Sequence, residues 1–150
     1  MGYNHEAVKA FKNELRSYKQ IKKDYENIGF KLTDINNKIF GFSGPNYDGM
    51  PRNQYNPLAP NPLTDLFEKK RELDSQLSIC YGRINNIETV LGLIDDEYRG
   101  SIYDIYVKGR SMALTAAKKD MSERSLKYWI NREIYNALIE RDNLIYDSKS

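Results

Sequence analysis

The sequence is poor in the residues that catalysis and metal binding most often use. It contains one cysteine, Cys80, and one histidine, His5, among its 150 residues. A disulfide framework or a site with several histidine ligands therefore cannot be built within the chain, and a lone cysteine in an apolar repeat is a poor nucleophile. Neither the Walker A motif nor the GxGxxG motif is present. We expect no enzymatic activity, no metal and no cofactor.

Long hydrophobic runs are also missing. No stretch reaches the roughly eighteen apolar residues that a membrane-spanning helix needs, and the first residues lack the apolar core of a signal peptide. Glu6 stands where N-myristoylation requires Ser or Thr. With a mean hydropathy of -0.72 and 29% charged residues, we expect a soluble cytoplasmic protein with elongated helices and no membrane partner.

Proline is confined to one stretch of the chain. All five prolines lie between residues 41 and 63, where they remove backbone donors and disfavour helix. We interpret 41–63 as a connector, either a surface linker or a polyproline ligand for another protein. On both sides of it, residues recur at steps of 3 or 4, the spacing of an amphipathic helix. The first set is Val8, Phe11, Leu15, Tyr18, Ile21, Tyr25, Ile28, Leu32, Ile35 and Ile39, and the second is Leu66, Lys70, Leu73, Leu77, Cys80, Ile84, Ile87, Leu91 and Ile94.

These two repeats predict long helices over residues 1–40 and 64–94, with Thr64 as the N-cap of the second. The spacing is close to the 3.5-residue period of a left-handed coiled coil, so each helix requires a partner. The two can fold back on one another as a hairpin, or pair between chains as a homodimer. We expect Cys80 to be a small core residue within this arrangement.

Positive charge gathers in the last third of the chain. Residues 99–141 carry nine basic and five acidic side chains, a net charge of +4 against +2 for the whole sequence. The pattern here also breaks into shorter segments, because an acidic run at 95–97, of the kind that breaks or caps a helix, interrupts the repeat. We predict a helix-turn-helix domain over 95–146 and a tail at 147–150. Its helices are expected at 99–107, 111–119 and 122–145, with turns at 108–110 and 120–121.

Serines mark the starts of the last two predicted helices, Ser111 and Ser122, whose hydroxyls can cap them. The helix from Ser111 would place Leu114 and Ala117 on one side, with Ala116 small enough to admit a neighbouring helix. The helix from Ser122 would bury Leu126, Ile130, Ile134, Ala137 and Leu138, and would expose Glu123, Arg124, Lys127, Tyr128 and Asn131, with Arg132 at the edge. Such a face suits the DNA major groove, where Arg and Asn make bidentate contacts to bases.

The same segment resembles the fourth region of bacterial sigma factors. The matching features are Ile105-Tyr106-Val107 at a helix end, Gly109 in the turn, Ser111 as cap, Ala116 in mid-helix, Met121-Ser122 at the second turn, and Ser125-Leu126, Ile130 and Arg132 in the recognition helix. In architecture the whole chain also resembles small phage and prophage late-gene regulators of Gram-positive bacteria. These include the staphylococcal late-transcription activators and the enterococcal autolysin-regulator-like group, which share a connector motif similar to residues 47–51.

The resemblance implies a sequence-specific transcription regulator in the bacterial host cytoplasm that binds double-stranded DNA at late-gene promoters. RNA polymerase is a candidate second partner, and a homodimer is expected because one small module buries little DNA surface. The predicted DNA-binding residues are Lys118, Lys119, Ser122, Arg124, Ser125, Lys127, Tyr128, Asn131 and Arg132. Two other interpretations stay open: a small terminase subunit that packages DNA, and a helical adaptor that binds only protein.

Two positions depart from the family pattern. Asp120 stands where many helix-turn-helix turns carry glycine, and it adopts a left-handed conformation less easily than glycine does. Trp129 stands where a basic residue is frequent, and it is a candidate for packing against the long helices. Both departures bear on the strength and sequence preference of DNA binding.

Overall fold

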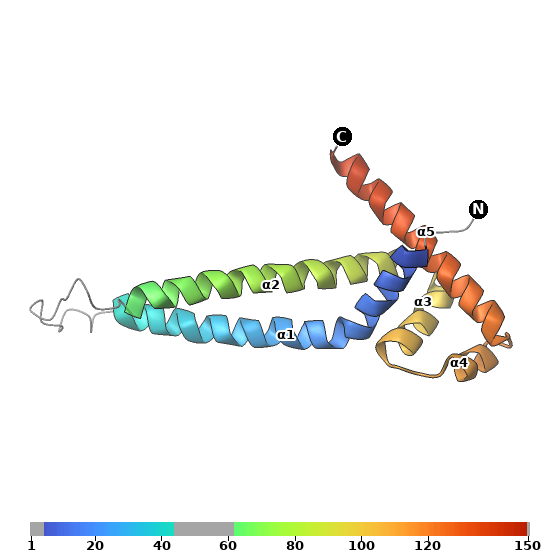
Figure 1. Ribbon diagram of the computed structural model, residues 1–150, viewed down its shortest axis with the longest axis horizontal. Coiled ribbons are helices and arrows are strands. Elements are labelled where there is room, and N and C mark those ends of the chain that lie inside the picture. Colours follow the sequence, from blue (N-terminus) through green and yellow to red (C-terminus); the bar gives the residue numbers. More distant parts are fainter. Residues whose placement is uncertain (1–4, 44–61, 150) are drawn as a thin grey trace, which may run out of the picture. The chain divides into compact units, whose positions relative to one another are not determined.

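The computed structural model describes residues 5–43 and 62–149, and every regular element within them is a helix (Figure 1). The prediction of an all-α fold is therefore confirmed for these residues. None of their helices is long and apolar enough to cross a membrane. The elements are α1 (His5–Ser43), α2 (Pro62–Leu93), α3 (Asp96–Ile102), the π-helical turn η3 (Tyr103–Val107), α4 (Met112–Lys118) and α5 (Glu123–Lys149).

Several helix ends differ from those predicted. α2 begins at Pro62 rather than after Thr64, because proline suits the first turn of a helix, where its missing N–H would have no partner. α1 continues to Ser43, three residues into the expected connector, and α5 continues to Lys149, so most of the expected tail is helical. The rest of the connector, including the motif at 47–51, lies outside the described residues.

The chain divides into two compact units. The two-helix unit comprises residues 22–81, of which 22–43 of α1 and 62–81 of α2 are described. These two segments run in opposite directions, and the rings of Tyr25 and Tyr81 meet with centroids 6.4 Å apart. Ile28, Leu32 and Ile35 are buried, as the helical repeat predicts. Cys80 is half-buried, so it is less enclosed than the expected core residue.

The terminal unit comprises residues 1–21 and 82–150, of which 5–21 and 82–149 are described. The first turns of α1 thus share a unit with the C-terminal part of α2 and all the shorter helices. This differs from the expected division, in which residues 95–146 formed a domain separate from the long helices. Its most enclosed apolar side chains come from α1, α2, α3, α5 and the link between α2 and α3, and they include Leu15, Ile87, Val90, Ile94, Ile102, Leu126, Ile130 and Ile134.

Polar contacts also hold α1 against the C-terminal part of α2 in this unit. The hydroxyl of Tyr18 donates to Oε1 of Glu88 at 2.7 Å. Burial, together with this acceptor, raises the pKa of Tyr18 to about 12. Arg83 forms a two-pronged ion pair with Glu14, with its Nη2 2.6 Å from Oε1. These bonds fix which faces of the two helices meet.

The junction between α2 and α3 depends on Asp95 and Arg99. Asp95, two residues after the end of α2, is not helical, with a ψ of 137°, and its carbonyl accepts the amides of Tyr98 and Arg99 at 3.0 and 2.9 Å. Asp95 is therefore the N-cap residue of a helix that starts at Asp96, three residues before the predicted start, and its side chain makes no capping hydrogen bond. The Arg99 guanidinium turns back and donates to the carbonyls of Leu91, Gly92 and Ile94 at 2.8, 3.2 and 2.8 Å. It thereby donates to two carbonyls in the last turn of α2 and to that of Ile94 just beyond it, and the Leu91 carbonyl also accepts the amide of Ile94 at 3.1 Å.

Candidate nucleic-acid interface

α4 and α5 form a helix pair joined by a tight turn. The Ser111 hydroxyl caps α4 by accepting the amide of Leu114 at 3.3 Å, which confirms the predicted N-cap. At the other end of α4 the amide of Met121 donates to the carbonyl of Ala116 at 3.0 Å, and that of Asp120 donates to Ala117 at 3.1 Å. This pair of bonds is the Schellman pattern of a helix that ends in a left-handed residue.

Asp120 is that left-handed residue, with a φ of 56°. Asp is among the few non-glycine residues that adopt this conformation with appreciable frequency. The departure from glycine noted in the sequence is therefore accommodated in the backbone of the turn. The turn at Gly109, with a φ of 73°, is also left-handed and there the chain does use glycine.

The start of α5 is capped by Ser122, as predicted. Its hydroxyl oxygen accepts the amide of Ser125 at 3.1 Å, and the two serine hydroxyls lie 3.0 Å apart. Both predicted DNA-binding serines are thus engaged with each other at the helix N-terminus. Their side chains hold the first turn of α5 in shape, and the hydroxyl of Ser125 remains exposed beside it.

α5 buries the stripe that its sequence predicted. Leu126, Ile130 and Ile134 are 0% exposed, whereas Arg124, Tyr128 and Arg132 are exposed. Since these two sets repeat every four residues and lie on opposite sides of the helix, the cationic and phenolic side chains face outward. On the outer side Nη1 of Arg132 donates to the hydroxyl of Tyr128 at 3.3 Å. We call Arg124, Ser125, Tyr128 and Arg132 the outer face of α5.

α4 packs on α5, and Ala116 is its buried residue. Ala116 is buried, as expected of a residue that admits a neighbouring helix, but Leu114 is 67% exposed and Ala117 is also exposed. Leu114 and Ala117, which were expected on one side of α4, therefore have no packing role, because Ala116 is the buried residue of this seven-residue helix. Leu114 is consequently an apolar side chain on the surface.

The two lysines at the end of α4 have different positions. Lys118 is exposed. Lys119 reaches back to α3, where its ammonium donates to the carbonyl of Glu97 at 2.6 Å and lies 5.3 Å from the ring centroid of Tyr98. Lys119 therefore joins α4 to α3, and of this pair only Lys118 points its charge freely toward solvent.

Trp129 packs against α3. Its indole stacks on the ring of Tyr98 with centroids 6.1 Å apart and planes at 17°, and meets Tyr128 edge to face at 5.5 Å. The guanidinium of Arg132 lies 5.6 Å from the same indole. The packing role considered for Trp129 is thus observed, with α3 as its partner rather than the long helices.

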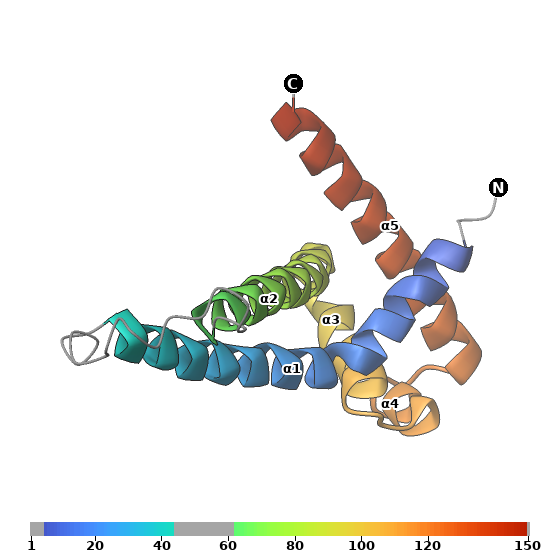
Figure 2. The same cartoon turned by 60° about the vertical axis from the view of Figure 1, so that its left-hand side comes forward.

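The other flank of α5 faces the first turns of α1 (Figure 2). The ammonium of Lys12 donates a hydrogen bond to Oδ1 of Asn131 and lies 5.3 Å from the ring centroid of Tyr106, as Arg16 does at 5.4 Å. Asn131 is half-buried, and its carbonyl oxygen is occupied. Asn131 is one of the predicted DNA-binding residues, and in this structure its side-chain oxygen is directed to Lys12 of α1.

An open groove of about 830 Å³ lies along this flank. Among the residues that line it, five are Lys or Arg and only Glu123 is acidic. Burial and the nearby charges of Lys127 and Arg16 lower the pKa of Lys12 from 10.5 to about 8. The cations are Lys9, Lys12 and Arg16 from α1 and Arg124 and Lys127 from α5, and we call these five the groove cations.

The three groove cations on α1 were not among the predicted site residues. They recur at steps of 3 and 4 beside the apolar stripe of Val8, Phe11 and Leu15. That spacing places them on one side of a helix, so the sequence contained a signal for a cationic stripe. It contained no signal for the helix that this stripe would face.

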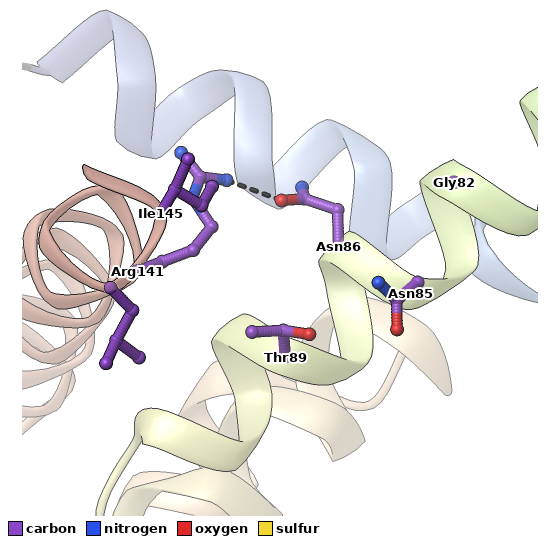
Figure 3. Close-up of a pocket in the computed structure, with 7 residues that line it drawn as sticks. Gly82, Asn85, Asn86, Thr89, Arg141 and Ile145 are labelled. Atoms are coloured by element: carbon purple, nitrogen blue, oxygen red, sulfur yellow. Dashed lines mark hydrogen bonds between the residues drawn. The ribbon is translucent and has the colours of Figure 1, made fainter. Parts of the chain in front are cut away.

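A second cavity, of about 260 Å³, lies between α2 and the C-terminal half of α5 (Figure 3). Nη1 of Arg141 donates to Oδ1 of Asn86 at 2.6 Å across it, and its Nε and Nη2 contact Asp142. Because the guanidinium is satisfied by these partners, we interpret this contact as one that docks α5 on α2.

Within residues 5–43 and 62–149, no cluster of three or more His, Cys, Asp or Glu side chains is placed to hold a metal ion. Comparison with protein-family models, with curated proteins and with solved structures finds no match. The resemblance to sigma region four and to phage late-gene regulators therefore remains a prediction from the residues.

Proposed function

We propose that this chain binds double-stranded DNA through the α4–α5 pair and acts as a transcription regulator. The observation that carries the proposal is the outer face of α5. Arg124, Tyr128 and Arg132 are exposed on one side of a helix whose opposite side is fully buried. A rigidly seated helix with guanidinium and phenol groups near its N-terminus is the element that several DNA-binding folds insert into the major groove.

The geometry of the turn supports this proposal. The capped start of α5 and the Schellman end of α4 fix the angle between the two helices with hydrogen bonds that involve Asp120, Met121 and Ser122. A recognition helix needs such support, because base contacts depend on side chains held at a fixed position. Lys118 at the end of α4 and Lys127 beside the outer face add exposed positive charge suited to phosphate contacts.

The proposal is tested by fluorescence anisotropy of a labelled random-sequence duplex at several salt concentrations. A charge-reversed protein, Arg124→Glu, Lys127→Glu and Arg132→Glu, is compared with a matched control, Lys31→Glu, Lys69→Glu and Arg71→Glu, whose sites are exposed in the two-helix unit. We expect wild type and control to bind with affinity that falls steeply as salt rises, and the charge-reversed protein to lose binding. Equal binding by all three proteins would refute a role for α5.

We further propose that the protein binds specific promoters and that its other partner is RNA polymerase or a second copy of this chain. Selection of bound sequences from a random pool should return one enriched site if the protein is a regulator. Mass in solution separates this role from DNA packaging, since a monomer or dimer favours a regulator and a large ring favours a small terminase subunit. A helical adaptor for protein would bind no DNA even at low salt.

A further inference from the structure

Five cations and a single acid, Glu123, line the groove between the first turns of α1 and α5. Among the described residues, no carboxylate lies within ion-pairing distance of Lys9, Lys12, Arg124 or Lys127. The single lining acid, Glu123, occupies the first turn of α5, where its charge is favoured by the helix dipole. The positive charge of the groove is therefore only partly neutralised by the protein's own carboxylates.

The surroundings of Lys12 also favour a bound anion. Its ammonium is partly withdrawn from water between Asn131 and the ring of Tyr106, and two of its nearest charges, Lys127 and Arg16, repel it. A lysine whose role was only packing would be replaced at lower energetic cost by an uncharged side chain. An anion bound in the groove would be attracted to several cations at once and would offset their mutual repulsion.

The form of the groove indicates the kind of anion. It is open rather than enclosed, and its cations come from two helices rather than from one loop. A single small phosphate would be cradled by backbone amides or by one cluster, whereas spaced cations along an open flank suit a series of phosphates. The groove also adjoins the outer face of α5, since Arg124 belongs to both surfaces.

We propose that the groove cations of α1, Lys9, Lys12 and Arg16, bind the phosphate backbone of the DNA duplex whose bases the outer face of α5 contacts. This inference rests on the proposed function and adds α1 to the DNA-binding surface. The contacts from α1 would set affinity and position, and those from the outer face would set sequence preference. In the bound state Lys12 contacts phosphate, and its hydrogen bond to Asn131 is shared or released.

The test is a salt titration of duplex binding by a neutralised protein, Lys9→Gln, Lys12→Gln and Arg16→Gln. Its matched control is Lys31→Gln, Lys69→Gln and Arg71→Gln, which removes the same three charges from the two-helix unit. We expect the slope of log affinity against log salt to fall by about 0.9 for each lost contact, or about 2.7 in all, with no change in the preferred sequence. The control should keep the wild-type slope.

Two further proteins keep the test decisive if the triple variant folds poorly. Lys9→Gln changes one exposed side chain and should lower the slope by about 0.9, and Lys12→Arg keeps the charge and should retain the slope. If wild type binds duplex and all α1 variants keep its slope, the inference is overturned and the proposed function stands. If wild type binds no duplex at any salt concentration, the proposed function fails and the inference fails with it.

Discussion

The lowered pKa of Lys12 predicts that the protein becomes more stable as the pH rises from 7 to 9. The ammonium faces Lys127 and Asn131 of α5, Arg16 of α1 and the ring of Tyr106, and burial with the two like charges lowers its pKa from 10.5 to about 8. Below pH 8 the folded and unfolded states are both protonated, so the folded state bears the full repulsion. Above pH 8 the folded state releases the proton, while the unfolded state keeps it until about pH 10.5.

The size of this effect follows from the two pKa values of Lys12. With 10.5 unfolded and about 8 folded, linkage gives a gain of about 1.3 kcal/mol between pH 7 and pH 9. Lys12 is only half-buried, so solvent screening reduces the expected gain to about 0.5–1 kcal/mol. Because tyrosines and other lysines begin to titrate above pH 9, the window stops there.

The assay is urea unfolding followed by circular dichroism at pH 7 and pH 9, for wild type and Lys12→Met. Methionine keeps the length of the side chain and removes the titrating group. Wild type should gain about 0.5–1 kcal/mol more than the variant over this interval, because every other titration is common to both proteins. An equal change in both proteins would show that Lys12 titrates normally and would refute the repulsion inferred in the groove.

Substitutions at four further sites are expected to change the free energy of unfolding, each measured by urea denaturation. Arg99→Met should cost about 2 kcal/mol because it removes the guanidinium donors from the carbonyls of Leu91, Gly92 and Ile94. Arg99→Lys lacks the planar fork and should restore little of this loss, and a loss below about 0.5 kcal/mol for Arg99→Met would contradict this role. Asp120→Gly should stabilise the folded protein by up to about 1 kcal/mol, because φ is 56° at this position and glycine adopts it without strain. Asp120→Val should destabilise the protein by about 1–2 kcal/mol for the same reason, and the opposite order of stability would exclude backbone strain at this turn. Ile130→Ala should cost about 2–5 kcal/mol because the side chain is 0% exposed, unlike the exposed control Leu114→Ala. Tyr18→Phe should cost about 1 kcal/mol through loss of the Glu88 bond, and an unchanged midpoint would mean that water replaces this bond.

The helical periodicity made much of the fold predictable. Leu126, Ile130 and Ile134 recur every four residues, and all three are fully buried. Ser111 and Ser122 cap the helices that follow them because short hydroxyl side chains reach the free amides of a first turn. Such features depend on neighbours within a few residues, which the sequence displays directly.

The parts that the sequence did not reveal depend on contacts between distant segments. Periodicity required a partner for the first apolar stripe but could not say that the flank carrying Lys12 would meet Asn131, 119 residues away. For the same reason the sequence predicts DNA contacts for Asn131 and Lys119 but does not reveal that both side chains also contact neighbouring helices. Amphipathic spacing identifies the buried side of a helix, but it does not distinguish the exposed side from a flank that another helix covers.

The terminal unit is assembled from residues 1–21 and 82–150, and this has a consequence for how the protein is made. The residue pairs that join α1 to α2 and to α5 are separated by 69 to 119 positions in the chain. A ribosome therefore completes the first stretch long before the segments that cover its apolar side chains. The terminal unit cannot form fully until α5 has been synthesised. Because its contacts join distant parts of the chain, the entropy cost of loop closure predicts slower folding for this unit than for the pair of α4 and α5 alone. Until then Val8, Phe11 and Leu15 are open to chaperones or to a neighbouring nascent chain.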